Sequence, residues 1–408
     1  ANSRLSSQLT VSGHRDWHPR FSPNGGELLF LSDRGGAAEI WRLNLRGGEA
    51  HRLFNSISDV TNFQWLPDGQ GVIFTMLDEL KDRDVLEVDT EHAFARLYRF
   101  DWSSVSPELL TEKDFHINSF DLSPDATWAA LSIQPTPSVP DARLHSDLKV
   151  FDLESRLVRD LVTRPGMDRD PKISPDGTKI AFVTMNGNAD WIGNYGVSVV
   201  KREGAELSDV SAAIDERVTA PLRWSSDGET IYVIAPNRTS RRIYAVDVKH
   251  GTSEVVTSFD ESKVVNSFDL FSKGRLVVTA SDPHTPAEVY EVGGDEEPKQ
   301  LTMLNVSYND NAVGRTEILT YERAGLTLEG LLVKPVGFKE GTKYPLLLVI
   351  HGGPAGVFEY AFRPRRGVYP IHAFSEVGYL VFMPNPRGSG GYGESFRKSN
   401  FQDWGFGD

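Results

Sequence analysis

Residues 344–354 have the sequence YPLLLVIHGGP, and this stretch decides how the C-terminal part of the chain folds. Its five apolar residues, 346–350, follow one another without polar alternation, which is typical of a strand buried on both faces of a parallel sheet. The paired glycines Gly352 and Gly353 let the backbone approach a ligand closely and turn its N–H groups outward. We therefore expect a central strand that opens into a glycine-rich loop, with a plain Gly-Pro turn as the alternative.

A second strand and loop of the same kind follow downstream. Residues 378–383, GYLVFM, predict another buried strand, and it leads into the stretch NPRGSGGYG at 385–393. The two stretches, together with Phe396 and the DWG sequence at 403–405, resemble the prolyl oligopeptidase family of serine peptidases. The resemblance is strongest to acylaminoacyl-peptidase-like and dipeptidyl-peptidase-like bacterial members, and it extends over essentially the whole chain.

The resemblance implies an α/β-hydrolase domain whose first glycine-rich loop contributes to an oxyanion hole. The backbone N–H of Gly353, supported by Gly352, would be one of the two donors that stabilise the tetrahedral oxyanion. Arg387 and Tyr392 are the candidate substrate-binding residues. For Arg387, the other interpretation is that it ties the 385–393 loop to backbone carbonyls.

The catalytic triad that this family requires is not apparent in the sequence. No Gly-x-Ser-x-Gly motif occurs in the 408 residues, and Ser389 lies in a glycine-rich turn without that spacing. His351 is expected to shape its loop rather than to act as a base. We therefore expect this chain to carry the oxyanion loop without the Ser-Asp-His triad and to be inactive alone. A complementary C-terminal fragment or subunit would supply the triad.

An internal repeat organises the first three hundred residues. A Pro/Ser-x-Gly-type turn recurs before an apolar strand, with spacings of 44, 57, 51, 51 and 46 residues that are typical of propeller blades. The turns lie at 23–25, 67–69, 124–126, 175–177, 226–228 and 272–274, and strands follow at 27–31, 72–75, 128–132, 179–183, 230–234 and 276–279. A third, alternating strand is visible at 39–43, 242–246 and 288–292. Four strands per repeat are expected.

The fourth strand of each repeat ends in an apolar residue followed by Thr or Phe. These signals lie at 9–10, 53–54, 110–111, 162–163, 218–219, 256–257 and 301–302. The sequence therefore has seven closing signals but only six opening turns. The unmatched one predicts an outer strand at 7–10, from a blade whose inner strands lie before Ala1. The expected propeller has six full blades plus part of a seventh.

The chain is expected to contain two domains. The stretch GGDEEP at 293–298 and the segment 305–315 separate the repeats from the hydrolase elements. We expect an all-β propeller domain at 1–304 and the N-terminal portion of an α/β-hydrolase catalytic domain at 305–408.

Besides the strands at 346–350 and 378–383, further elements are expected in the second domain. Residues 316–321 and 327–333 alternate and predict a pair of antiparallel strands. The first crossover helix should lie within 358–377, where two prolines obscure its start. Residues 397–408 are expected to approach a second helix.

Composition and charge narrow the class of protein. The 39% hydrophobic and 25% charged content is that of a soluble globular protein, either cytoplasmic or periplasmic. The 43 Lys and Arg residues against 57 Asp and Glu give a net charge of −14, which excludes nucleic acid and an anionic membrane surface as expected partners. The absence of cysteine excludes disulfides, thiolate metal sites and a Cys nucleophile. We expect no cofactor and no membrane span.

Two clusters that resemble metal sites are better explained as propeller loops. His14 and His18 have metal-ligand spacing only on a helix, whereas the repeat places them at the entrance of a strand. Asp78, Asp82 and Asp84 lack the glycine and the terminal glutamate of a calcium loop. Neither cluster predicts a metal site.

Two functions from different classes are considered. The first is a serine peptidase that cleaves short peptides, with the propeller gating access to an active site between the domains. The second is a non-catalytic propeller that binds protein partners, although such a module needs no oxyanion donors. Residues 187–194 lack the Glu-Glu pair with which dipeptidyl-peptidases of the family hold the substrate's amino terminus, which favours an acylaminoacyl-peptidase or oligopeptidase activity. The sequence leaves a homo-oligomer open.

Overall fold

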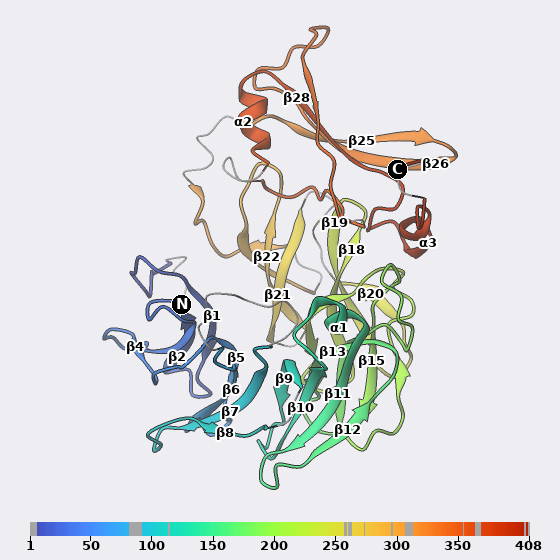
Figure 1. The fold of residues 1–408 in the computed structure, drawn as a ribbon. Helices are drawn as coiled ribbons and strands as arrows, with labels where there is room; N and C mark the ends of the chain where they lie inside the picture. Colours follow the sequence, from blue (N-terminus) through green and yellow to red (C-terminus); the bar gives the residue numbers. More distant parts are fainter. Residues whose placement is uncertain are drawn as a thin grey trace. The chain divides into compact units, whose positions relative to one another are not determined.

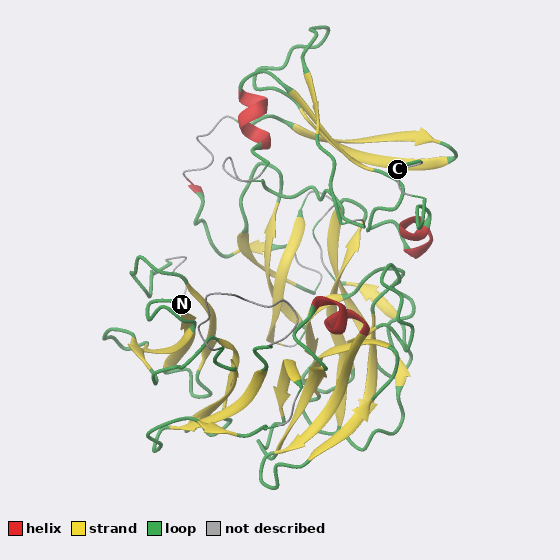
Figure 2. Cartoon of the chain, viewed as in Figure 1, coloured by secondary structure: helices red, strands yellow, loops and turns green. Residues whose placement is uncertain are grey.

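The computed structural model describes residues 6–80, 92–112, 115–256, 259, 263–272, 274–294, 297–306, 313–353, 355–363, 369–403 and 405–406. Strands are the main regular secondary structure among these residues, and the helices among them are short (Figure 2). The chain forms two compact units. The N-terminal unit comprises Ser7–Trp191 and Val197–Ser208, and the C-terminal unit is built mainly from Asp209–Asp408 with Ile192–Gly196. The two units are described separately.

The N-terminal unit is built from sheets of consecutive, mostly antiparallel strands (Figure 1). Two sheets have four strands each, β1 to β4 and β5 to β8, and an eight-stranded sheet forms where β11 and β13 pair in parallel. The elements are β1 (Asp16–Phe21), β2 (Glu27–Ser32), β3 (Glu39–Asn44), β4 (His51–Arg52), β5 (Val60–Trp65), β6 (Gly71–Leu77), β7 (Ala95–Asp101), β8 (Glu108–Leu109), β9 (His116–Leu122), β10 (Trp128–Gln134), α1 (Val139–Leu144), β11 (His145–Asp152), β12 (Val158–Val162), β13 (Gly166–Ile173), β14 (Lys179–Thr184), β15 (Gly196–Lys201) and β16 (Ser208–Asp209).

The turn before the second strand of each repeat has a left-handed residue at its end. Gly25 has φ +69°, and its N–H donates to the Ser22 carbonyl at 2.8 Å. Ala126 occupies the same place in the third repeat with φ +54°, and its N–H donates to Ser123 at 2.9 Å. Glycine adopts this conformation without steric cost, which explains its recurrence in the turns. The predicted second and third strands of the repeats are confirmed.

Neighbouring sheets of the N-terminal unit pack on each other through fully buried apolar side chains. Leu29 of β2 packs with Phe63 of β5, and both are 0% exposed. Ile73 of β6 and Leu131 of β10 belong to the next cluster and are equally buried. Each group of strands therefore shares its core with the group before and the group after it, which is the packing of propeller-like repeats.

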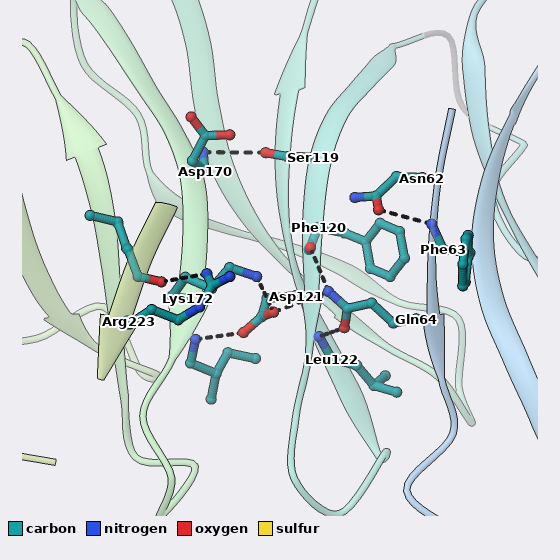
Figure 3. Close-up of polar contacts among 12 residues, drawn as sticks. Asn62, Phe63, Gln64, Ser119, Phe120, Asp121, Leu122, Asp170, Lys172 and Arg223 are labelled. Atoms are coloured by element: carbon teal, nitrogen blue, oxygen red, sulfur yellow. Dashed lines mark hydrogen bonds and ion pairs between the residues drawn. The ribbon is translucent and has the colours of Figure 1, made fainter. Parts of the chain in front are cut away.

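Polar side chains connect the first strands of successive repeats (Figure 3). Gln64 on β5 donates to Asp121 on β9 at 3.1 Å, and its Oε1 accepts the Leu122 N–H at 3.0 Å. Asp121 also accepts from Lys172 on β13 at 2.6 Å and from the Ile173 N–H at 2.8 Å. The carboxylate of Asp121 thus holds strands that belong to three different repeats.

The C-terminal unit contains two four-stranded antiparallel sheets and one mixed sheet. The mixed sheet has the order β25-β26-β28-β27, in which β27 runs parallel to β28 and the other pairs are antiparallel. The helix α2 begins directly after Pro370 and packs through Ile371 against the core of this sheet. The elements are β17 (Thr219–Trp224), β18 (Thr230–Asn237), β19 (Ser240–Asp247), β20 (Ser253–Val255), β21 (Val264–Ser272), β22 (Arg275–Ser281), β23 (Glu288–Val292), β24 (Lys299–Gln300), β25 (Thr316–Arg323), β26 (Leu326–Val333), β27 (Leu346–Leu348), α2 (Ile371–Glu376), β28 (Leu380–Asn385) and α3 (Glu394–Lys398).

Three sequence predictions about strands and helices are wrong. Residues 7–10 form no strand, because no neighbouring strand in the described part of the chain pairs with them, and Leu9 is 49% exposed. The signal at 218–219 does not close a fourth strand but begins β17, since β16 already ends at Asp209. The second helix begins earlier than expected, because α3 starts directly after Gly393, whereas residues 397–408 were expected only to approach a helix.

The prediction that residues 346–350 form a central strand buried on both faces is also wrong for the described residues. β27 lies at the edge of the mixed sheet and covers only three residues. Leu346, Leu348 and Ile350 are 60%, 53% and 64% exposed. The composition of a strand indicates what it can bury, but burial itself depends on what packs against it.

Several residues singled out in the sequence lie outside the described part of the structure. They are Asp82, Asp84, Thr257, Lys273, Pro354, Pro364 and Trp404.

Candidate active-site loop

The chain leaves β27 and makes a turn at Gly353 that only glycine fits. Gly353 has φ +143°, and a Cβ built on it would lie 2.6 Å from the backbone nitrogen of Gly356. At Gly352, by contrast, a Cβ would meet no described atom within 4 Å. The structure therefore requires glycine at position 353 but not at position 352, a difference that is not visible in the sequence.

His351 holds this turn against the 385–393 loop. Its Nε2 lies 3.0 Å from Oγ of Ser389, and the Ser389 hydroxyl donates to the Pro386 carbonyl at 2.7 Å. Burial lowers the pKa of His351, and its ring packs edge-on against Phe358 with centroids 5.2 Å apart. These are the contacts of a histidine that shapes a loop.

Asn385, the last residue of β28, joins the same two segments. Its side chain is 0% exposed, its Oδ1 accepts the Phe358 N–H at 2.7 Å, and its Nδ2 donates to the Phe358 carbonyl at 3.1 Å. The N–H of Gly390 adds a bond of 3.1 Å to the carbonyl of Gly356. Because a buried amide with satisfied bonds is costly to displace, Asn385 fixes the 351–358 segment relative to β28.

The hydroxyl of Tyr392 is occupied by two internal hydrogen bonds. It donates to Glu329 at 3.0 Å and accepts from Nδ2 of Asn385 at 3.2 Å. Burial raises the pKa of Tyr392, which keeps the phenol in its donating form. Glu329 lies on β26, is 6% exposed and also accepts from Nε of Arg238 at 2.9 Å. This arrangement supports a positioning role for the Tyr392 hydroxyl.

The N–H groups of Gly391 and Gly393 converge on the carboxylate of Glu216. Both donate to the same oxygen at 2.8 Å, and the other oxygen accepts from Arg397 at 2.7 Å. Arg397 is 0% exposed, and its Nε donates to the Ile192 carbonyl at 2.9 Å. A buried ion pair is tolerated when its remaining hydrogen-bonding capacity is satisfied in this way.

Arg387 has a different partner from the one predicted. It does not tie the loop to backbone carbonyls in the contacts seen here but donates to the carboxylate of Asp403 at 2.6 Å. A carboxylate outcompetes a carbonyl for a guanidinium because both charges contribute. Its Nε is buried and has no hydrogen-bond partner among the described residues.

The structure brings the 351–353 turn and the 385–393 loop together. Sequence reasoning missed the three charged residues that hold the loop, Glu216, Glu329 and Arg397. Glu329 had a local signal, since it interrupts the apolar residues of β26. Glu216 and Arg397 had none, because their pairing joins positions 181 residues apart.

The two histidines of the first cluster have different partners in the structure. His14 faces the carboxylate of Asp33 at 3.6 Å, and His18 packs against Phe63 instead. No cluster of three or more potential metal ligands is found among the described residues. Within the same residues, no helix has the length and apolarity needed to cross a membrane.

Comparison with known proteins gives relatives that are peptidases. No protein-family model matches the chain. The uncharacterized peptidase YuxL of Bacillus subtilis (strain 168) is 26% identical over 96% of this chain and 64% of its own length. Dipeptidyl-peptidase 5 of Trichophyton schoenleinii is 26% identical over 59% of this chain and 33% of its own length. The chain thus spans less than two thirds of each of these relatives.

The fold agrees with the sequence relatives. The structure of the uncomplexed acylaminoacyl peptidase of Pyrococcus horikoshii matches 95% of this chain and 60% of its own with a TM-score of 0.76, at 20% identity. At that identity the match shows the fold, and the sequence relatives carry the reaction class. In sequence and in fold, the chain therefore resembles the serine peptidases of the prolyl oligopeptidase family.

Proposed function

We propose that this chain is part of a serine peptidase that cleaves short peptides, of the acylaminoacyl-peptidase or oligopeptidase type. The observation that carries the proposal is the turn at Gly353, which follows a strand of the mixed sheet and requires glycine. Acyl transfer needs backbone donors that reach the developing oxyanion, and in this fold such a turn supplies one of them. The printed names of the relatives support the same reaction class.

The residues of the two loops take distinct roles in this proposal. Gly353 donates its N–H to the oxyanion, and Gly352 provides the flexible approach to the turn. Arg387 contacts the substrate from the loop that its bond to Asp403 helps to hold. Tyr392 lines the substrate side of the loop with its ring, while its hydroxyl holds the loop on Glu329.

The proposed domain organisation is a propeller at 1–304, with six full blades, that controls access to the active site. Residues 305–408 form the N-terminal portion of the catalytic domain. Since no Gly-x-Ser-x-Gly motif occurs in the chain, we place the triad on a complementary C-terminal segment or subunit. The chain matches 64% and 33% of the length of the two relatives.

The test compares the full-length protein with the 408-residue chain alone. Both are assayed with an N-acyl-aminoacyl anilide and with a dipeptidyl anilide that has a free amino terminus, with and without a serine-directed phosphonate. We expect phosphonate-sensitive turnover by the full-length protein only, with the acylated substrate preferred. A full-length protein that neither hydrolyses these substrates nor reacts with the phosphonate would favour the non-catalytic propeller that binds protein partners. Turnover by the chain alone would place a nucleophile within residues 1–408.

A further inference from the structure

The acidic residue Glu216 occupies a small backbone anion site in the 385–393 loop. The N–H groups of Gly391 and Gly393 lie two residues apart and point at one oxygen of its carboxylate, both at 2.8 Å. Converging backbone N–H groups of this kind form an anion-binding concavity. Here the anion belongs to the chain itself, and Glu216 is only 6% exposed.

The cation that balances Glu216 is held as firmly as the carboxylate. Arg397, on α3, is 0% exposed, and it donates to Glu216 at 2.7 Å, to the Ile192 carbonyl at 2.9 Å and to the side chain of Asn194. The neighbouring Asp215 accepts the Glu394 N–H at 3.1 Å and the Asn194 amide at 3.0 Å. Both ends of the loop's last turn are therefore bonded to the segment around residue 216.

The loop has no room to relax away from this position. Gly391 has φ +92°, and a Cβ there would lie 2.5 Å from the carbonyl of Arg238, whose own N–H donates to the Gly391 carbonyl at 2.6 Å. These contacts with Arg238 restrict the loop at Gly391. A substitution at Glu216 is therefore expected to shift the backbone of the 389–393 segment.

A continuous set of contacts leads from Glu216 to the turn at Gly353. The segment that Glu216 anchors begins at Gly390 and Ser389. Gly390 donates its N–H to the carbonyl of Gly356 at 3.1 Å, and Ser389 contacts Nε2 of His351 at 3.0 Å. These two contacts lie on either side of Gly353 in the sequence.

We infer that Glu216 and Arg397 are positioning residues that set the orientation of the Gly353 N–H through the 389–393 segment. The inference rests on the proposed function, because the N–H matters for rate only if it serves an oxyanion. A donor that acts on the transition state changes kcat and leaves KM largely unaltered. Substitution of a purely structural residue would instead lower the amount of folded protein, without a selective decrease in kcat at unchanged KM.

The test uses the full-length protein with three variants. Glu216→Gln keeps the shape of the side chain, but its amide has a single acceptor oxygen for which Arg397 and the glycine N–H groups compete. In Glu216→Gln/Arg397→Met the cation is gone, and the amide oxygen is available to both N–H groups. Asp168→Asn is the matched control, since Asp168 is 1% exposed in the N-terminal unit and is likewise paired with an arginine, Arg164, at 3.0 Å.

Two measurements are made on each variant. We expect Glu216→Gln to lower kcat by about 10–100-fold with KM changed less than about threefold, as for a small misplacement of a catalytic group. Amide hydrogen exchange in a peptide covering 389–393 should be faster in Glu216→Gln than in the wild type. In the double variant, kcat and the exchange rate should both return most of the way to the wild-type values. The inference is overturned if Glu216→Gln lowers kcat no more than Asp168→Asn does, or if loop exchange is unchanged. Absence of turnover in the wild type would count against the proposed function, while the exchange data would still decide whether Glu216 orders the loop.

Discussion

The Nε2 atom of His351 lies 3.0 Å from Oγ of Ser389, a separation typical of a catalytic base and its nucleophile. The hydroxyl hydrogen of Ser389 is nevertheless directed to the Pro386 carbonyl, and the side chain is 1% exposed. A nucleophile must present its oxygen to a substrate, whereas this oxygen is enclosed in its own turn. The pair therefore joins two loops.

Replacing Ser389 by Ala tests this assignment. We expect the full-length enzyme to keep its reactivity toward a serine-directed phosphonate and to lose less than about tenfold in kcat, because a single hydrogen bond between loops contributes about 1 kcal/mol. The measurement is active-site titration with the phosphonate, followed by steady-state kinetics. Complete loss of labelling in folded Ser389→Ala would make Ser389 the nucleophile.

The two glycines of the turn should respond differently to alanine. Gly353→Ala requires an unfavourable φ and places a Cβ 2.6 Å from the Gly356 nitrogen, so the donor must move. Removal of one oxyanion donor costs about 2.7–4 kcal/mol of transition-state stabilisation, and we expect kcat to fall by about 10²–10³-fold. At Gly352 the space is open, and the loss in Gly352→Ala should be much smaller. Equal kinetics of the two variants in the full-length enzyme would refute the assignment of Gly353.

The stability of the N-terminal unit should depend on pH through His18. Burial and the nearby Arg20 lower the pKa of His18 from 6.5 to about 4. Between these two pH values the unfolded chain binds a proton that the folded chain does not, so the free energy of unfolding decreases as pH falls from about 6.5 toward 4. Above about pH 6.5, His18 is neutral in both the folded and the unfolded chain, and the free energy of unfolding no longer changes with pH through this residue.

The variant His18→Asn isolates this effect. Asparagine tolerates the left-handed φ of +56° at this position and does not titrate. Denaturant unfolding at pH 7 and pH 5 should show a smaller difference in the variant, by about 1 kcal/mol after allowance for partial exposure of the ring. His14→Asn, at an exposed position four residues earlier, is the control. The same pH dependence in wild type and His18→Asn would contradict the prediction.

The turn of the third repeat offers a stabilising substitution. Ala126 has φ +54°, where the equivalent residues Gly25 and Gly177 have +69° and +71°. Relief of left-handed strain should outweigh the added flexibility of glycine, so Ala126→Gly should raise the free energy of unfolding by about 0.5–1 kcal/mol. The midpoint of thermal unfolding should rise by about 1–4 °C. The reciprocal change Gly177→Ala should lower it, and a decrease in Ala126→Gly would show that the strain is absent.

The sequence alone determined the repeating part of this protein. Turns such as 23–25 and 175–177 need a left-handed residue, and the strands after them are continuous runs of mostly apolar residues. Both requirements are local, so they are visible without a structure. The same holds for the family resemblance, because the loops around Gly353 and Tyr392 are contiguous in sequence.

Only the tertiary structure decided which residues hold the candidate site. The exposure of β27 at the edge of its sheet and the absence of a strand at 7–10 depend on which segments lie beside them. The bonds from Glu216 to Gly391 and Arg397 join positions more than 170 residues apart. The sequence around an isolated glutamate in a loop does not predict which backbone N–H groups will donate to its carboxylate. Contacts of this kind are set by chain topology, whereas turns and strand periodicity are set by neighbouring residues.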